Sequence, residues 1–334
     1  MKKMKKVLVL SLSLALTMGM FTGCGTKDDA KTSFGKDGVI NIGVSQLVTH
    51  DALDASYKGF VDGLSEAGYV DGDNIKIDYQ NASGDQSNCT TIAQKLVTDN
   101  NDLILAIATN AAQACANATT EIPILITAVT DPAATGLVET NEAPGGNVSG
   151  TSDLTPVEEQ MKLLKRILPE AKKVAILYCS SEVNSQIQAD MAEEEAKNLG
   201  LEVVHATVSA SSEIQQVVES LINKVDAIYA PTDNMIASGM ATVAMIANEN
   251  NLPVIVGEEG MLSEGGLATY GINYYELGKQ TAAQAVKLFK GEAKIDSMPI
   301  EYINSEKVTL KINEDVANQL GIVIPDEVLA EANQ

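Results

Sequence analysis

The sequence predicts an α/β protein with two doubly wound parallel-sheet lobes, and three observations predict it. Short apolar segments alternate with amphipathic segments from residue 39 onward, as strands and helices do in such folds. The apolar segments are continuous rather than alternating, which is typical of strands covered by helices on both faces. The alternation starts again after residue 150, so most of the 334 residues fall into two similar arrays.

The first array covers residues 39–150 and contains three expected helices. In the first of these helices Phe60, Leu64 and Ala67 share one face, and Gly68 provides the C-terminal stop. We expect strands at 39–44, 74–79, 102–108, 123–129 and 147–150, and helices at 54–68, 90–100 and 111–119.

The second array opens with Thr155-Pro156-Val157-Glu158, which predicts a capping box with proline at the first helical position. That helix is expected to run to Leu168, because Val157, Met161 and Leu164 mark one face with it. We expect further strands at 173–178, 201–207, 227–230, 253–256, 267–270, 299–303 and 308–312, and helices at 184–199, 212–223, 235–250 and 274–290.

The amino-terminal segment has the features of a bacterial lipoprotein signal. Four lysines precede an apolar run over residues 7–23, which ends in Phe21-Thr22-Gly23-Cys24 and resembles a lipobox. We therefore expect residues 1–23 to be a signal peptide, Cys24 to carry lipid, and residues 24–38 to form a flexible tether. The body would then lie on the outer face of the cytoplasmic membrane. The alternative is a single membrane helix, for which the apolar run is short.

The net charge of −22 excludes one class of partner. Without the four signal-segment lysines, 19 basic residues oppose 45 acidic ones, which leaves −26. Nucleic-acid binding needs a basic surface, so we expect no nucleic-acid partner. Arg166 is the single arginine, and it lies in an expected surface helix. A bound anion would therefore be held by neutral donors rather than by a guanidinium.

Polar residues follow several expected strands, where parallel sheets bind ligands. The candidate ligand-binding residues are Gln46, Thr109, Thr130, Asp131, Asp153, Tyr178, Asn184, Asp233 and Asn234. Hydroxyls of Thr109 and Thr130, with helix N-termini, suit an α-carboxylate. Asp153 or Asp233 suits an α-ammonium, and Tyr178 offers an aromatic face. The same residue types also serve as helix N-caps.

Enzyme motifs are missing from the sequence. It contains no GxSxG, no phosphate-binding loop, no CxxC and no metal-ligand spacing, and His50 and His205 are its two imidazoles. We expect no catalysis, no metal and no cofactor. An amino-acid racemase that uses Cys89 and Cys179 as facing thiols stays open as an alternative. A sugar ligand is another, although 4% aromatic residues and no Trp disfavour it.

Several segments together resemble one family. They include Thr127-Ala128-Val129-Thr130-Asp131-Pro132, Pro144-Gly145-Gly146-Asn147-Val148, Ser152-Asp153-Leu154-Thr155-Pro156, Tyr229-Ala230-Pro231-Thr232-Asp233-Asn234 and Tyr274-Tyr275-Glu276-Leu277-Gly278. With them, the chain from about 39 to 325 resembles ABC-transporter substrate-binding lipoproteins of the tryptophan/tyrosine type. That family has the type I periplasmic-binding-protein fold.

The resemblance implies that a monomer captures a free amino acid, often aromatic, for a membrane permease and its ATPase. It also implies three crossings between lobes, near 150–153, 271–273 and 303–307. The N-terminal lobe would comprise 39–150 plus about 272–303, and the C-terminal lobe 151–271 plus about 307–330. The chain departs from the family at Cys179-Ser180, where Asn-Pro is usual, and at Asp51 and Asn110, where Pro is usual.

Overall fold

The structure is a computed structural model that describes residues 34–35 and 38–333. All of these residues belong to one compact unit. The expected signal peptide, Cys24 and most of the expected tether lie outside the described residues. Within the described part, no helix has the length and apolar character needed to span a membrane.

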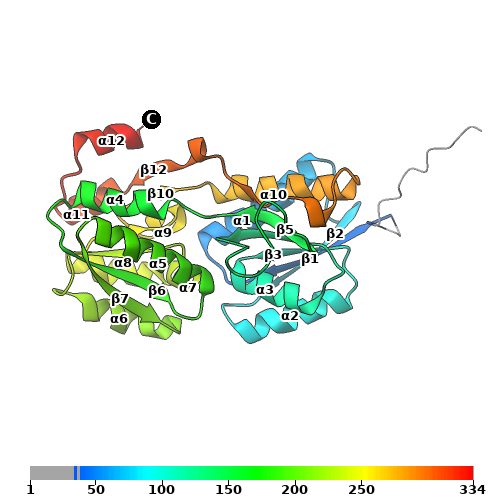
Figure 1. Cartoon of the computed structure of the whole chain (residues 1–334), viewed down its shortest axis with the longest axis horizontal. Helices are drawn as coiled ribbons and strands as arrows, with labels where there is room; N and C mark the ends of the chain where they lie inside the picture. The colour runs from blue at the N-terminus through cyan, green and yellow to red at the C-terminus, as the bar shows by residue number, and fades with distance from the viewer. Residues whose placement is uncertain (1–33, 36–37, 334) are drawn as a thin grey trace, which may run out of the picture. The chain divides into compact units, whose positions relative to one another are not determined.

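Two six-stranded sheets organise the chain, with strand orders β11-β5-β4-β3-β1-β2 and β12-β10-β9-β8-β6-β7 (Figure 1). The first sheet consists of β1 (Ile40–Gln46), β2 (Ile75–Asn81), β3 (Leu103–Ile107), β4 (Ile124–Val129), β5 (Val148–Ser152) and β11 (Glu301–Tyr302). The second consists of β6 (Lys173–Cys179), β7 (Glu202–Val208), β8 (Ala227–Ala230), β9 (Val254–Val256), β10 (Ala268–Gly271) and β12 (Thr309–Ile312). The predicted α/β fold is confirmed.

Helices cover both sheets, and we call each sheet with its helices a lobe. The N-terminal lobe has α1 (Asp51–Glu66), α2 (Gln86–Thr98), α3 (Thr109–Ala118) and α10 (Tyr274–Phe289). The C-terminal lobe has α4 (Val157–Ile167), α5 (Val183–Asn198), α6 (Ile214–Leu221), α7 (Asn234–Ser238), α8 (Met240–Glu249), α9 (Glu259–Ser263), α11 (Glu314–Gln319) and α12 (Asp326–Ala332). Short 3-10 helices span Ser211–Glu213, Ile295–Ser297 and Ser305–Lys307.

Helix α10 packs against α1, although more than 200 residues separate them in sequence (Figure 1). Two glycines allow the close approach. A Cβ at Gly59 would lie 2.0 Å from the Tyr275 carbonyl oxygen, and one at Gly278 would lie 2.0 Å from the Ser56 carbonyl oxygen. The first turn of α10 is therefore fixed to the N-terminal lobe by backbone contact.

The structure corrects three details of the expected elements. β12 runs antiparallel to β10, whereas parallel strands were expected throughout. Helix α4 begins at Val157 without the expected capping box, because the Thr155 hydroxyl contacts the Thr232 hydroxyl at 3.4 Å. The helix expected over 235–250 breaks at Gly239 into α7 and α8.

Each lobe has its own hydrophobic core, and the core strands are buried along their length. All five residues of β3 and all six of β4 are buried between helices, as the continuous apolar runs predicted. The carboxyl ends of these strands leave the core and carry polar side chains, which makes them the place to look for a ligand site.

Candidate ligand-binding site

Four predicted site residues lie at the carboxyl ends of strands in the N-terminal lobe or at the first crossing between lobes. Gln46 ends β1, Thr109 begins α3 after β3, Thr130 follows β4, and Asp153 follows β5. None is more than 3% exposed. Buried polar side chains at strand ends need partners, so the partners of each group decide its role.

Asp153 is buried with one carboxylate oxygen unpaired. Its Oδ2 accepts a hydrogen bond from the Tyr274 hydroxyl at 2.8 Å, whereas its Oδ1 has no partner in the structure. Among the described residues no basic side chain forms an ion pair with it. Burial raises the pKa of Asp153 to about 6, and the hydroxyls of Tyr274 and Thr130 oppose that rise. Oδ1 of Asp153 is therefore a buried acceptor, and a nearby cation would stabilise its charged form.

The β3–α3 junction is strained and uncapped. Ala108 has φ +79° and precedes α3, whose N-terminus receives no side-chain cap. Ala128, two residues before Thr130, also has positive φ at +54°. Non-glycine residues in this region cost energy and cluster at functional sites. The junction leaves first-turn amide groups of α3 and the Thr109 hydroxyl for an anionic group.

Two side-chain amides, one at the end of β1 and one in the first turn of α5, provide further buried acceptors. Nδ2 of Asn184 faces the Thr232 carbonyl and Glu182. Nε2 of Gln46 donates to the Val48 carbonyl at 2.8 Å and to Asp54 at 2.6 Å. Because these partners accept hydrogen bonds, each amide has one orientation. Their oxygens, Oδ1 of Asn184 and Oε1 of Gln46, are buried and unpaired.

Asp233, the other candidate for an ammonium group, has both oxygens occupied. Its Oδ1 accepts from the Ile236 amide at 2.7 Å and caps α7, and its Oδ2 accepts from the Cys179 amide at 2.6 Å. Glu182 likewise accepts from the Asn234 and Met235 amides, and its pKa rises to about 8 through burial and the nearby Asp233. These carboxylates hold the ends of C-terminal-lobe strands, so of the two predicted candidates for an ammonium group Asp153 is the one with an unpaired oxygen.

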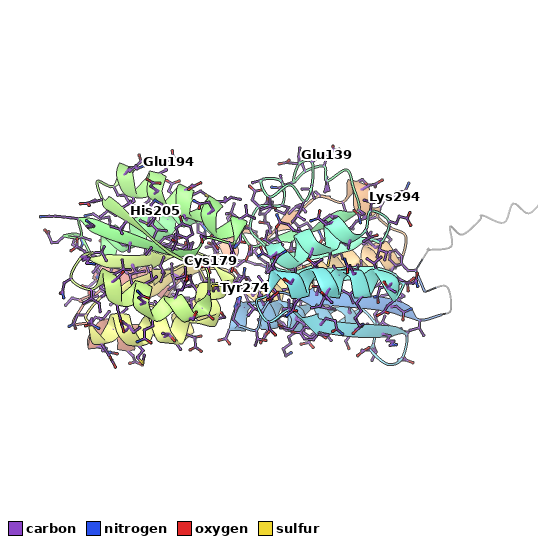
Figure 2. The ribbon with its side chains drawn as sticks, turned by 90° about the horizontal axis from the view of Figure 1, so that it is seen from below. Glu139, Cys179, Glu194, His205, Tyr274 and Lys294 are labelled. Carbon is purple, nitrogen blue, oxygen red and sulfur yellow. The ribbon has the colours of Figure 1, made fainter. Side chains whose placement is uncertain are left out.

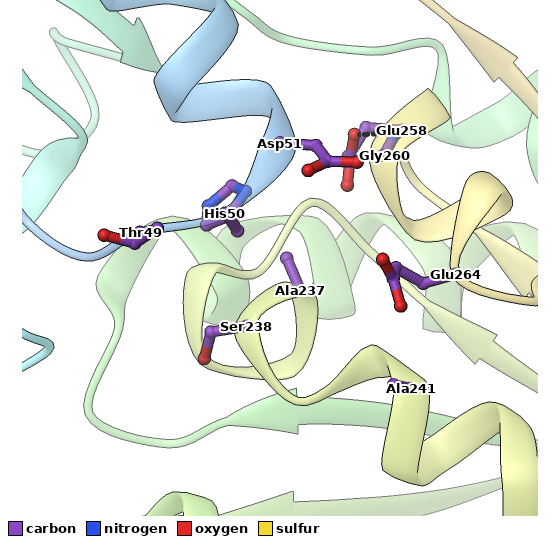
Figure 3. A pocket seen from close by; sticks show the side chains of 9 residues that line it. All are labelled: Thr49, His50, Asp51, Ala237, Ser238, Ala241, Glu258, Gly260 and Glu264. Atoms are coloured by element: carbon purple, nitrogen blue, oxygen red, sulfur yellow. Dashed lines mark hydrogen bonds between the residues drawn. The ribbon is translucent and has the colours of Figure 1, made fainter.

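The lobes touch through a few polar contacts. His50 Nε2 lies 3.3 Å from Oδ1 of Asn234, and Gln188 Nε2 donates to the Thr130 hydroxyl at 3.3 Å. The Ser263 hydroxyl donates to Asp51 at 3.3 Å. A pocket of about 160 Å³ between the lobes brings His50 and Asp51 opposite Glu258 (Figure 3).

Asp131 and Tyr178, also predicted to bind the ligand, have other partners in the structure. Asp131 accepts from the Ala133 and Ala134 amides, so it stabilises a turn. The Tyr178 ring packs in a hydrophobic cluster of the C-terminal lobe, with its hydroxyl 3.4 Å from His205 Nδ1. Figure 2 shows His205 well away from Tyr274, which lies at the junction of the lobes. We therefore propose a ligand site that does not include Asp131 and Tyr178.

The Tyr178→Leu variant, which removes the aromatic face, tests this assignment. We expect it to bind amino acids with the wild-type dissociation constant, because the ring packs in the hydrophobic cluster of the C-terminal lobe rather than against the ligand. Calorimetric titration of both proteins measures the change. A dissociation constant raised about tenfold or more would return Tyr178 to the site.

Sequence reasoning missed four buried groups that shape the site: Glu182, Gln188, Glu258 and Tyr274. Glu182 and Glu258 each lie within three residues of a strand end, so their position was a usable signal. Burial raises the pKa of Glu258 to about 7. Tyr274 likewise lies three residues after β10, but its partner Asp153, like the Thr130 partner of Gln188, is remote in sequence.

The facing thiols expected for a racemase are not formed. Cys89 is buried in the core of the N-terminal lobe on α2, and Cys179 packs in a core cluster of the C-terminal lobe. Burial raises the pKa of Cys89 to about 11 and also raises that of Cys179. Thiols held in two separate cores and kept protonated cannot exchange a proton with one substrate.

Two α/β lobes with strand ends and unpaired acceptors buried between them define a two-lobed solute-binding protein. Known proteins agree with this class. The profile of the family described as ABC transporter substrate binding protein matches residues 41–334. The chain therefore belongs to the ABC transporter substrate-binding protein family. Members of this family bind solutes rather than catalyse reactions, and those of ABC importers work outside the cytoplasm.

Three relatives are informative. The "Tyrosine-binding protein" of Clostridioides difficile (strain R20291) is 45% identical over 327 residues, which cover 96% of this chain and 93% of that protein. The crystal structure of an ABC domain in complex with L-Trp from Streptococcus pneumoniae has a TM-score of 0.85 and 41% identity, over 89% of this chain and 99% of that one. A ligand-free, open substrate-binding protein with adhesive properties from Clostridium difficile has a TM-score of 0.66 and 47% identity, over 86% and 97%.

Proposed function

We propose that the protein captures a free amino acid with an aromatic or other apolar side chain for an ABC importer. One observation carries the proposal: Asp153 is buried with a free Oδ1, and no basic side chain among the described residues forms an ion pair with it. A buried carboxylate without a partner is costly, and the α-ammonium group of an amino acid supplies the missing charge and hydrogen bond.

The α-carboxylate would be held by the first turn of α3. The uncapped amide groups there and the Thr109 hydroxyl are neutral donors, and the positive end of the helix dipole favours an anion. Arg166 is occupied elsewhere, because its guanidinium donates to Tyr270 and Glu331. The ligand's ammonium group would thus meet Asp153, and its carboxylate would meet the N-terminus of α3. Both partners lie in or next to the N-terminal lobe.

The ligand's side chain would extend between the lobes. A pocket of about 110 Å³ adjoins the site there, since its lining includes Leu47, next to Gln46, and Asn110, next to Thr109. Val48 and Met235 add apolar surface from the two lobes. The unpaired oxygens of Gln46 and Asn184 would accept hydrogen bonds from donors on the ligand, whereas Asn234, which lines the pocket, has its Oδ1 3.3 Å from His50.

The relatives support this proposal. One is named for tyrosine, and another holds L-Trp. The structure resembles the L-Trp complex more closely than the ligand-free open protein, although the open protein has the higher sequence identity. The higher TM-score to the ligand-bound structure supports a closed arrangement of the lobes, in which the strand ends are buried and the ligand would be enclosed.

Membrane attachment and partners complete the proposal. We propose that Cys24 carries lipid, that residues 24–38 tether the body to the outer face of the cytoplasmic membrane, and that the protein works as a monomer with permease subunits. An intact-mass measurement on protein purified from membranes would show the mass of a chain that starts at a diacylated Cys24.

Calorimetric titration of refolded, ligand-free protein with each of the twenty amino acids tests the function. We expect heat with aromatic amino acids and none with the matching aromatic carboxylic acids that lack an ammonium group. No heat with any amino acid, together with heat from a sugar, would contradict the proposal and favour the sugar alternative.

A further inference from the structure

We propose that Tyr274 is a positioning residue for the ligand ammonium, and that its bond to Asp153 ties ammonium capture to two of the crossings between the lobes. The inference rests on the proposed function and adds to it the first residue of α10. Tyr274 would not touch the ligand. It would act by holding Asp153 in one orientation.

The bond joins segments that are far apart in the chain. Asp153 follows β5, where the chain leaves the N-terminal lobe, and Tyr274 follows β10, where the chain returns to it. The Tyr274 hydroxyl donates to Oδ2 of Asp153 at 2.8 Å across 121 residues of sequence, and both side chains are at most 5% exposed. The carboxylate that meets the ligand is therefore linked to both crossings at once.

Tyr274 is itself held firmly by the N-terminal lobe. Asn273 caps α10 through its bond to the Glu276 amide at 3.0 Å, and the Ser56 hydroxyl donates to the Tyr274 carbonyl at 3.3 Å. The close approach of Gly278 to Ser56 fixes the same turn. With its backbone held at these points, Tyr274 can direct the orientation of Asp153.

The chemistry of the pair favours one role for each carboxylate oxygen. Burial and the neighbouring Asp153 raise the pKa of Tyr274 well above its usual value, so its hydroxyl stays protonated and donates. Oδ2 is then occupied by a neutral donor, and Oδ1 is left for the ammonium. Without the hydroxyl Oδ2 would lose this hydrogen bond, and the carboxylate would lose its fixed direction.

The hydroxyl also affects when Asp153 is charged. The pKa of Asp153, about 6, is lowered by the Tyr274 hydrogen bond, so removing the hydroxyl raises that pKa further. The other titratable groups nearby are Glu258, whose pKa is about 7, and beyond it Asp51 and His50. These groups are present in wild type and variant alike, so a difference between their pH profiles reports on Asp153.

The test compares Tyr274→Phe with wild type in calorimetric titrations with L-tyrosine and L-tryptophan between about pH 5 and pH 8. We expect the variant's dissociation constant to rise about tenfold near pH 8, as loss of a hydrogen bond to a charged group predicts. The ratio should grow as the pH falls, because an ammonium needs the ionised carboxylate and the variant loses that form at higher pH.

Tyr229→Phe is the matched control. It removes a buried hydroxyl that donates to Gln160 at 2.7 Å inside the C-terminal lobe, so it should keep the wild-type affinity and pH profile. A carboxyl carbon NMR titration of Asp153 in ligand-free protein adds a second readout, with a higher pKa expected in Tyr274→Phe.

The outcomes separate the two claims. If wild type binds and Tyr274→Phe matches it in affinity, pH profile and Asp153 pKa, the positioning role is overturned and the proposed function stands. If wild type binds no amino acid at any pH, the proposed function fails and this inference fails with it. A weakened affinity with an unchanged pH profile would indicate a merely structural role and also overturn the inference.

Discussion

The Asp153→Asn variant should bind amino acids about 100-fold or more weakly than wild type, because truncating one partner of a buried charge pair costs about 2–5 kcal/mol. Asparagine fits the same space and can still accept the Tyr274 hydrogen bond. It lacks the negative charge that the α-ammonium requires. Calorimetric titration with L-tyrosine and L-tryptophan at about pH 8, where Asp153 is ionised, measures the loss.

The same variant should be more stable than wild type when no ligand is present. The pKa of Asp153 is raised from 3.8 to about 6, so the folded protein loses stability as the pH rises from about 4 to about 6, where the carboxyl ionises in the unfolded chain before it does so in the folded one. Each pKa unit corresponds to about 1.4 kcal/mol, so Asp153→Asn should gain up to about 3 kcal/mol in unfolding free energy near pH 8. Thermal melts of the ligand-free proteins near pH 8 test this, and Asp153→Asn should melt at a higher temperature than wild type.

Asp131→Asn provides the matched control for both measurements. Its side chain accepts backbone hydrogen bonds in a turn, and an asparagine oxygen can accept them too. Binding should therefore stay at the wild-type level. Equal binding by wild type and Asp153→Asn, or a loss of binding in Asp131→Asn, would contradict the assignment of the ammonium group.

Gly278→Ala should destabilise the N-terminal lobe strongly. The new Cβ would lie 2.0 Å from the Ser56 carbonyl oxygen and 2.9 Å from the Phe60 amide nitrogen, both backbone atoms. Helices α1 and α10 would have to separate, and such overpacking costs about 1–3 kcal/mol or more. For a lobe of this size we expect a melting temperature lower by at least about 4 °C.

Amino-acid affinity should fall in the same variant, because the displaced turn of α10 carries Tyr274. Gly146→Ala is the control: its Cβ meets nothing within 4 Å, and Gly146 does not have positive φ. It should melt as wild type does. If Gly278→Ala melted at the wild-type temperature, the close contact between α1 and α10 would not exist in solution.

The sequence contained enough information for the fold, because hydrophobic periodicity and strand-end chemistry are local signals. The continuous apolar run that became β3 and the polar residues after β1, β3 and β4 are examples. Local signals were weaker where a side chain had two possible uses. Asp233 and Asp153 looked equivalent in sequence, and only the amides of Cys179 and Ile236 show that Asp233 is occupied.

The rest of the site depends on contacts between remote segments. Nothing near Tyr274 in sequence indicates that its hydroxyl reaches Asp153, and the strand pattern around Tyr178 does not say which face of the sheet its ring occupies. Gln188 reaches Thr130 from the middle of α5 in the same way. These pairings follow from how lobes and crossings pack, which periodicity does not encode.

A crystal structure of the protein with L-tyrosine or L-tryptophan tests the central claim most directly. We expect the ligand nitrogen about 2.7–2.9 Å from Oδ1 of Asp153, with Tyr274 still bonded to Oδ2 and the ligand carboxylate at the first turn of α3. A ligand nitrogen held by another group, with Oδ1 of Asp153 left unpaired, would contradict it.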